Sequence, residues 1–190
     1  MNAHGGTLTG INYNKQMLLI RCTGKLRKIG GWKIDEPDEG SVDPARVWYA
    51  NLLWVDRRKC ILFTHGMTLF SVFVPDVRKS NLADLRLMLE EAVYHQLIFD
   101  GIDLNDAEPV LGIQDEHVVV GVARDRRILG SMTDQAFQYE YHIGANGGLP
   151  HVHPRLLARS INEAPMSLLQ LNNPHSAMIE LVGAGKPRPL

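Results

Sequence analysis

The chain has 190 residues, of which 45% are hydrophobic and 22% charged, a composition typical of one packed globular domain. Its formal net charge of −1 at pH 7 excludes a strong long-range attraction between the whole molecule and polyanions, so any nucleic-acid contact would need a local basic patch. The apolar runs are too short to span a membrane. Cys22 and Cys60 are the only cysteines of the sequence, so no disulfide framework is expected. Together with the lack of a signal-peptide pattern, this predicts a cytoplasmic protein.

The amino-terminal quarter alternates between turn-forming and apolar segments. Residues 1–16 contain several Gly and Asn without hydrophobic periodicity and are predicted to be a flexible extension. The apolar run at residues 17–22 predicts a buried strand, and Thr23 is a candidate cap for a short helix through Lys28. Residues 32–46 are acidic and punctuated by Gly and Pro, which predicts a surface loop.

Three strands are predicted next, at residues 47–55, 59–64 and 68–74. Each is rich in β-branched and aromatic side chains, and the separators between them are short enough for hairpins. These strands are therefore expected to form an antiparallel meander. Because apolar residues occur at both parities in each strand, both faces of the sheet are expected to be at least partly covered.

The next part is predicted to contain one long helix followed by a loop. Ser80 or Asn81 is expected to cap the helix, and Leu85 and Leu89 fall on its apolar stripe. Gly and Pro residues over residues 101–112 then predict a loop. Leu85 and Leu89 are therefore expected in the core.

The carboxyl-terminal part combines one strand with several helices. Residues 117–123 predict a strand, and Ser131 is expected to open a helix with an apolar inner face. Two short helices are predicted further on, one with Pro154 in its first turn and one with Asn173 as cap and Pro174 as first residue. Residues 183–190 are rich in Gly and Pro and predict a flexible tail.

Together these elements predict one α+β domain over residues 17–182. Its antiparallel or mixed sheet is expected to be built around the meander and packed with about four to five helices. The runs of turn residues do not divide the chain into two cores, because 190 residues is the usual size of a single domain.

Three stretches carry a resemblance to a known family: residues 21–26 (RCTGKL), 49–60 (YANLLWVDRRKC) and 127–134 (RILGSMTD). With them, most of the chain resembles a family of uncharacterised bacterial domains of unknown function. The resemblance implies a small cytoplasmic protein and lends no catalytic residues. This chain differs from the family pattern in its segment before Met17 and in Thr133, where relatives often carry asparagine.

A weaker similarity suggests an association with mobile elements. Residues 160–174, with their Asn-Pro pair, are similar to the Asn-x-x-Pro ending of some insertion-sequence transposases. A helix that Asn173 caps and Pro174 starts explains the same residues without that association. We therefore favour the capping interpretation.

The strongest candidate site is an arginine cluster beside the predicted helix start at Ser131. Arg124, Arg126 and Arg127 come just before this serine, and a helix amino terminus presents N–H donors and a partial positive charge. Guanidinium groups can meet two oxygens of a phosphate or carboxylate at once. The cluster therefore predicts an anion-binding site, whereas a solvated turn with a serine cap is the structural alternative.

A second basic group, Arg57, Arg58 and Lys59, lies at a predicted hairpin turn. If the fold brings it to the same face as the arginine cluster and the basic residues around Thr23, the combined patch would suit a nucleic-acid backbone. Scattered surface charge is the alternative. An enzyme that handles phosphate, such as a nuclease or nucleotidyl transferase, would need carboxylates for Mg²⁺, and Asp56, Asp125 and Asp134 are the candidates.

Metal and thiol chemistry have weaker signals. Glu91 with His95, and His151 with His153, have spacings that metal ligands use, but neither pair forms a complete ligand set. Cys60 lies among large apolar residues and Cys22 just before a helix cap, and no catalytic signature surrounds either thiol. No metal and no cofactor is therefore predicted.

The sequence thus favours a non-enzymatic binding or regulatory domain that recognises an anionic partner, either nucleic acid or a phosphate-bearing ligand. The phosphate-handling enzyme and a plain protein-interaction domain with a protein partner remain as alternatives. A convex basic face would favour binding, whereas two carboxylates close together in a cleft would favour the enzyme. A contiguous apolar patch without clustered arginines would favour the protein-interaction domain.

Overall fold

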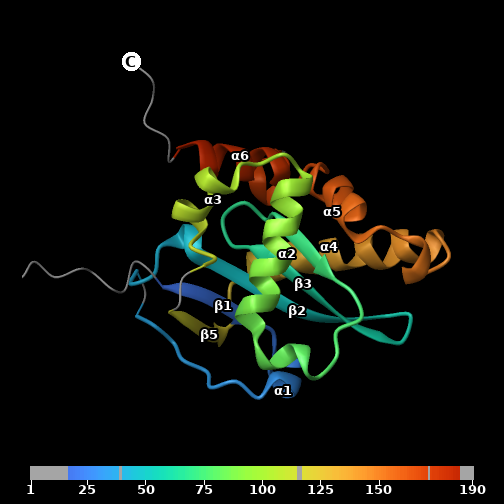
Figure 1. The fold of residues 1–190 in the computed structure, drawn as a ribbon, viewed down its shortest axis with the longest axis horizontal. Helices are drawn as coiled ribbons and strands as arrows, with labels where there is room; N and C mark the ends of the chain where they lie inside the picture. Colours follow the sequence, from blue (N-terminus) through green and yellow to red (C-terminus); the bar gives the residue numbers. More distant parts are fainter. Residues whose placement is uncertain (1–16, 39, 115–116, 171, 185–190) are drawn as a thin grey trace, which may run out of the picture.

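The computed structural model describes residues 17–38, 40–114, 117–170 and 172–184. In this part of the chain, five strands form one mixed sheet of order β4-β3-β2-β1-β5, with six α-helices around it (Figure 1). The strands are β1 (Leu18–Cys22), β2 (Val47–Val55), β3 (Arg58–His65), β4 (Ser71–Val74) and β5 (Val118–Val122). The helices are α1 (Gly24–Gly30), α2 (Leu85–Phe99), α3 (Leu104–Leu111), α4 (Arg126–Ala145), α5 (Pro154–Asn162) and α6 (Pro174–Ala184).

The sheet combines the predicted meander with a parallel part. β2, β3 and β4 pair antiparallel in chain order, as the short separators predicted. The turn between β2 and β3 places both Asp56 and Arg57 at positive φ, 48° and 62°, which is the backbone of a two-residue hairpin turn. β1 pairs parallel with β2 on one side and with β5 on the other. The α+β class and the mixed sheet are thereby confirmed.

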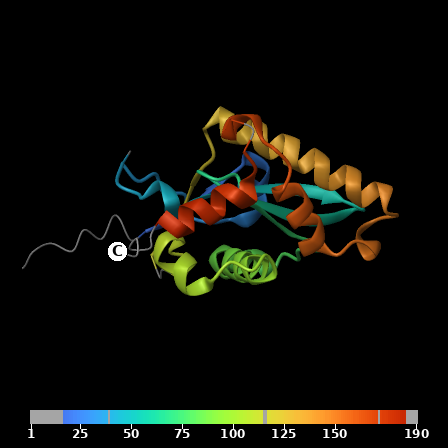
Figure 2. The same ribbon diagram turned by 90° about the horizontal axis from the view of Figure 1, so that it is seen from above.

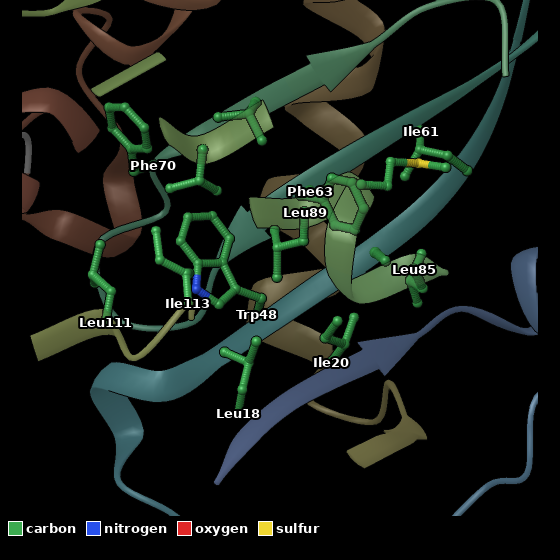
Figure 3. Packing of buried hydrophobic residues seen from close by; sticks show 14 of the residues in the cluster. Leu18, Ile20, Trp48, Ile61, Phe63, Phe70, Leu85, Leu89, Leu111 and Ile113 are labelled. Atoms are coloured by element: carbon green, nitrogen blue, oxygen red, sulfur yellow. The ribbon is translucent and has the colours of Figure 1, made fainter. Parts of the chain in front are cut away.

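α2 and α3 lie on one side of the sheet and α4 on the other (Figure 2), whereas α5 packs against the edge strand β4. α1, α2, α3 and α6 contribute to the larger apolar cluster on the first face, where Trp48 and Phe63 are fully buried. Leu85 and Leu89 point from α2 toward these strand residues, so their predicted burial is confirmed (Figure 3). α4 covers the second face, and both faces of the sheet are therefore buried at the meander.

Three helix boundaries differ from the sequence-based expectation. α4 begins at Arg126, where Asp125 accepts a hydrogen bond from the Arg127 amide, and not at Ser131. α2 begins at Leu85 with Asp84 as its cap, because the Ser80–Asn81 region forms a separate short turn. α3 occupies residues predicted as a loop. In all three helices the capping residue is an aspartate whose side chain accepts a backbone N–H.

β4 begins at Ser71, three residues after the predicted start of this strand, because residues 66–70 form the turn that follows β3. Other helix boundaries agree with the sequence. α1 ends at Gly31, which has a φ of 68°, and α5 and α6 begin at the predicted prolines. Thr23 precedes α1, yet its hydroxyl donates to Asn51 Oδ1 in β2 and caps nothing. The predicted extension at residues 1–16 and most of the predicted tail lie outside the described residues. None of the described helices is both long and apolar enough to cross a membrane.

The β4 edge of the sheet is closed by a neutral side chain. The Asn162 amide, at the end of α5, accepts from the Ser71 backbone N–H at 2.8 Å and donates to the Ser71 carbonyl at 2.9 Å. Both residues are fully buried. Tyr139 from α4 also hydrogen-bonds with the Ser71 hydroxyl. The side chain of Asn162 thus replaces one residue of a neighbouring strand.

The β5 edge is closed by charged side chains. The Asp35 backbone N–H donates to the Val120 carbonyl, and the Glu36 carboxylate accepts from the Val122 N–H at 2.7 Å. Arg21 Nη1 donates to the Val122 carbonyl at 3.0 Å. Gly121 lets this segment approach, because a Cβ there would lie 3.3 Å from Leu19 Cδ1 and 3.4 Å from the Asp35 carbonyl oxygen.

His65, at the end of β3, is a buried neutral imidazole. Its Nε2 lies 2.9 Å from the Ala45 carbonyl, which can only accept, so Nε2 carries the proton. Nδ1 then accepts from Thr68. Burial lowers the pKa of His65 to about 4, against the opposing effect of the Ala45 carbonyl. This side chain holds the β3–β4 connection in place as a neutral group.

Candidate functional site

The two parallel strands β1 and β5 lie side by side, and the chain leaves their carboxyl ends toward opposite faces of the sheet. After β1 it enters α1, whose Leu26 packs in the cluster on the first face. After β5 it enters α4, whose Ile128 and Met132 pack against Tyr49 on the second face. Such a reversal creates a crevice at the carboxyl ends of the strands, which is the usual ligand position in open sheets of this kind.

A cavity of about 550 Å³ occupies this position. It is lined by Arg21, Glu36, Pro37, Tyr49, Arg124 and Asp125. Arg21 and Tyr49 come from neighbouring parallel strands and point to the same face because the two residues are paired in register. Arg124 and Asp125 come from the connection between β5 and α4. Four segments that are far apart in the sequence therefore meet here.

The arginines of this cavity share one carboxylate. Arg21 Nη1 lies 3.4 Å from Glu36 Oε2, and Arg124 Nη2 lies 3.7 Å from Glu36 Oε1. Both distances exceed the 2.7–2.9 Å that is usual for a strong charge-assisted hydrogen bond. The Arg124 side chain is 68% exposed, so its guanidinium group is only weakly held by Glu36.

Asp125 and Arg127 form the second charged pair, at the start of α4. Arg127 Nη2 lies 2.9 Å from Asp125 Oδ2, and the Arg127 backbone N–H donates to Asp125 Oδ1. The hydrogen bond from the Arg127 side chain, together with the backbone N–H groups of Arg127 and Ile128, holds the pKa of Asp125 below its usual value. Asp125 thus occupies donors of the helix amino terminus, and the guanidinium groups are the donors left for a ligand.

Tyr49 is the one polar side chain of the cavity that is more than nine-tenths buried and forms no hydrogen bond to any residue that the structure describes. Burial raises the pKa of its hydroxyl, against the opposing effect of the Arg21 guanidinium. The charges of Asp125 and Arg127 also act on the pKa of this hydroxyl, which places it close to the second pair. A protonated hydroxyl that lines a cavity without a partner is a donor available to a ligand.

The structure brings only part of the predicted anion site together. Arg126 and Arg127 form the first turn of α4, and Arg124 lies just before it, so the arginines do stand at a helix amino terminus. Ser131 does not, because α4 starts five residues earlier than predicted and the serine is a buried residue inside the helix. The placement of Ser131 at a helix start was therefore wrong.

The second basic group lies at the other end of α4. Asp56, beside Arg57, accepts a hydrogen bond from the Leu149 N–H, just beyond the carboxyl end of the helix. The 20 residues of α4 span about 30 Å, so the two basic groups are not neighbours. Arg58 pairs with Asp76, and Lys59 lies over the Trp54 ring. Arg21 is the basic residue that the fold adds to the arginine cluster.

The carboxylates proposed for Mg²⁺ are dispersed. Asp56 lies near the carboxyl end of α4, Asp125 caps its amino end, and Asp134 is an exposed residue more than two turns further along the helix. Glu91, His95 and His153 all line a separate cavity of about 360 Å³ between β4, α2 and α5. Across the described ranges, however, no three His, Cys, Asp or Glu side chains converge as a possible metal site.

Both cysteines are buried apolar residues of the core. Cys22 and Cys60 are fully inaccessible. Burial raises the pKa of the Cys22 thiol to about 12, and it raises the pKa of the Cys60 thiol as well. Because the thiolate is the reactive form, these environments suit packing and not nucleophilic chemistry.

Sequence reasoning missed Tyr49 and Glu36 as site residues. Tyr49 falls in a strand that was predicted to be covered on both faces, and Glu36 in the predicted acidic surface loop. A partial signal was present, because strand periodicity puts Leu19 and Arg21 on one face of β1 and pairs the polar Arg21 with Tyr49 on the same face of β2. The signal becomes interpretable only once β1 is known to lie between β2 and β5.

The fold and the cavity define an α+β protein whose candidate ligand site lies where two parallel strands diverge, as in other open sheets. A family model described as a domain of unknown function (DUF6933) matches residues 19–177, and the chain belongs to this family. The inferred resemblance to a domain of unknown function is thereby confirmed. No curated protein and no solved structure gives a significant match.

Proposed function

We propose that this protein is a binding or regulatory domain that recognises a phosphate-bearing ligand in the crevice between the carboxyl ends of β1 and β5. The observation that carries the proposal is the cavity in which Arg21 and Arg124 lie with the hydroxyl of Tyr49, a residue that is 6% exposed and forms no hydrogen bond to the described residues. A phosphate accepts hydrogen bonds from all three groups, and a guanidinium group offers it two donors in one plane.

The charge balance of the site supports an anion. Three guanidinium groups, from Arg21, Arg124 and Arg127, face the two carboxylates of Glu36 and Asp125. The amino end of α4 adds a partial positive charge in the same direction. The long Arg124–Glu36 pair is the weakest of these contacts, so Arg124 is the side chain that we expect to turn toward an incoming phosphate.

The shape of the site favours a compact ligand over a polymer. A nucleic-acid backbone is bound along an extended basic surface, whereas the arginine cluster lies in a hollow and the second basic group is a helix length away. The dispersed aspartates supply no support for a metal-dependent nuclease. We therefore infer binding of a small phosphate-bearing molecule, with nucleic acid as the competing outcome of the test.

Titration calorimetry tests this proposal directly. Inorganic phosphate, single-stranded DNA and duplex DNA are titrated into the full chain at low and moderate salt, with Arg124→Gln as the test variant and Arg57→Gln as the matched control. Phosphate should saturate one site, Arg124→Gln should weaken it about tenfold, and Arg57→Gln should leave it unchanged. Absence of saturable phosphate binding at low salt, or equal binding by Arg124→Gln, would reject the proposal.

The DNA titrations separate the two ligand classes. If DNA binds with a steep salt dependence and Arg57→Gln weakens that binding, the basic surface is a nucleic-acid interface and the compact-ligand proposal is rejected. If DNA binding is weak and phosphate binding depends on Arg124, the crevice is the site.

A further inference from the structure

A second cavity continues from the first along the same face of the sheet. Its volume is about 240 Å³, and it shares Arg21, Pro37 and Tyr49 with the candidate site. Its remaining walls are mainly apolar, from Leu19, Val42, Pro44, Val47 and Met67, with Asp38 as its carboxylate. The two cavities therefore form one groove with a charged end and an apolar end.

The charged end and the apolar end of the groove correspond to successive residues on the same face of β1 and β2. One step of two residues leads from Leu19 to Arg21 on β1 and from Val47 to Tyr49 on β2, and each step covers about 7 Å. α4 packs on this face at Tyr49 and runs from there toward the far end of β2. Leu19 is almost fully buried, at 1% exposed, and Val47 is partly buried beside the cluster that includes Tyr49, so only a small part of their surface lines the cavity. The opposite wall is formed by Pro37, Asp38, Gly40, Val42 and Pro44.

A glycine keeps the apolar end open. A Cβ on Gly66 would lie 3.1 Å from the Val47 carbonyl oxygen and 3.4 Å from the Tyr49 ring. A side chain at this position would press on the residue that joins the two cavities. The exposed Met67 beside it is free to cover a ligand, since 48% of its surface is accessible.

From this groove we infer the class of ligand: a phosphate monoester whose phosphate lies at Arg21 and Arg124 and whose compact apolar or aromatic body fills the second cavity, past the Tyr49 hydroxyl. The inference rests on the proposed phosphate site. It adds the apolar or aromatic part of the ligand, which would give the site its selectivity. Together the cavities have the size of small-molecule sites, which are mostly apolar with a few placed polar groups.

Among the described residues that line the apolar end, Asp38 is the one with a carboxylate, and it narrows the choice of ligand further. Asp38 offers an acceptor to a hydroxyl or amino group on the ligand body. A nucleoside monophosphate and a simple aryl phosphate share the phosphate and the ring, and they differ in such groups. Both are therefore used as probes.

The test compares four probes by titration calorimetry on the full chain: inorganic phosphate, phenyl phosphate, adenosine monophosphate and adenosine. At least one ring-bearing phosphate should bind about tenfold more tightly than inorganic phosphate, with a negative heat-capacity change, because the ring leaves water. Tighter binding of the nucleotide than of phenyl phosphate indicates a nucleotide ligand, and the reverse indicates an aryl phosphate. Adenosine alone should bind far more weakly, because it lacks the group that the arginines hold.

Two variants distinguish the apolar end from the phosphate end. Met67→Gln should abolish the advantage of the ring and leave the affinity for inorganic phosphate unchanged. Ile179→Gln is the matched control, because Ile179 on α6 is equally exposed, at 48%, and lies outside the groove. It should change neither affinity.

Different experimental results would reject the ligand class and the proposed phosphate site. If inorganic phosphate binds but all phosphates bind equally, or if Met67→Gln leaves the ring advantage intact, the ligand class is rejected and the phosphate site survives. If no phosphate binds, the proposed function is rejected and this inference with it.

Discussion

The two edges of the sheet are closed in chemically opposite ways. At β4, Asn162 supplies a neutral amide that is fully buried and satisfies both backbone groups of Ser71. At β5, Glu36 and Arg21 supply charged groups that satisfy the two backbone groups of Val122. The neutral closure lies between β4 and α5, whereas the charged closure lines the candidate cavity.

The difference in burial and charge indicates that the β4 closure is a fixed structural contact, whereas the β5 closure can exchange its partners. A buried amide cannot leave its partners without exposing them to an apolar environment, which costs free energy for each orphaned group. A partly exposed ion pair can be exchanged for water or for a ligand at little cost. We therefore expect the β4 closure to determine stability and the β5 closure to determine binding.

Removal of the β4 closure should lower the free energy of unfolding more than any other change proposed below. Asn162→Ala leaves the Ser71 N–H and carbonyl without partners and creates a cavity, so the free energy of unfolding should fall by about 3 to 5 kcal/mol. Urea unfolding measures this change. Asn146→Ala, which removes an exposed amide bonded to the His142 carbonyl, serves as the control and should change stability by less than about 0.5 kcal/mol. Similar losses for both variants would mean that the edge closure is unimportant.

Acid should destabilise the β3–β4 side of the molecule through His65. The unfolded chain takes up a proton near pH 6.5 and the folded chain only near pH 4, so stability is lost as the pH falls through this interval. The shift corresponds to about 3 kcal/mol. Urea unfolding at several pH values measures the slope. His65→Gln should be less stable at pH 7 but should show a flatter profile, and an unchanged slope would contradict the assignment.

A side chain at Gly121 should weaken the β5 edge to an intermediate degree. Gly121→Val presses on Leu19 and on the Asp35 carbonyl, and we expect a loss of about 1 to 3 kcal/mol in the free energy of unfolding. Gly130→Ala is the control, because a Cβ at that exposed helix position meets nothing within 4 Å and should stabilise by up to about 1 kcal/mol. Thermal unfolding of both variants measures the two changes. If Gly121→Val left the stability unchanged, the segment around Asp35 would not be tightly packed against β5.

Neutralising the β5 closure should have the smallest effect on stability and the clearest effect on binding. In Glu36→Gln the side-chain oxygen can still accept from the Val122 N–H, so the free energy of unfolding should change by less than about 1 kcal/mol. Loss of the negative charge should raise the affinity for inorganic phosphate severalfold. Glu163→Gln, at an exposed position after α5, is the control. Unchanged phosphate affinity in Glu36→Gln would argue against an anion at this site.

Local signals explain which elements could be predicted from the sequence. The meander followed from short separators between β-rich runs, and α5 and α6 followed from Pro154 and Pro174 at their first positions. α3 was missed because Pro109 and Gly112 suggested a loop, although Pro109 lies in the last turns and Gly112 forms a left-handed cap. These errors concern boundaries, where short sequence signals compete.

The candidate site was only half predictable, because half of it depends on distant pairing. Arg124 and Arg127 are adjacent in sequence and were identified together. Tyr49 and Arg21 join them only because β1 pairs with β5, and the contact between Arg21 and Val122 spans 101 residues. Hydrophobic periodicity assigns residues to a face but does not give the order of strands in a sheet.

The closure at Val122 also provides a built-in reporter of site occupancy. The Val122 amide proton is held by the Glu36 carboxylate and not by a neighbouring strand, so its protection from exchange with deuterated solvent depends on where that carboxylate lies. A phosphate that draws Arg21 and Arg124 away changes the balance of charges around Glu36 and hence this exchange rate. The Ser71 amide, held by the buried Asn162, should exchange at the same rate with and without ligand. One spectrum of the protein can therefore follow binding at one edge of the sheet while the other edge serves as its internal standard.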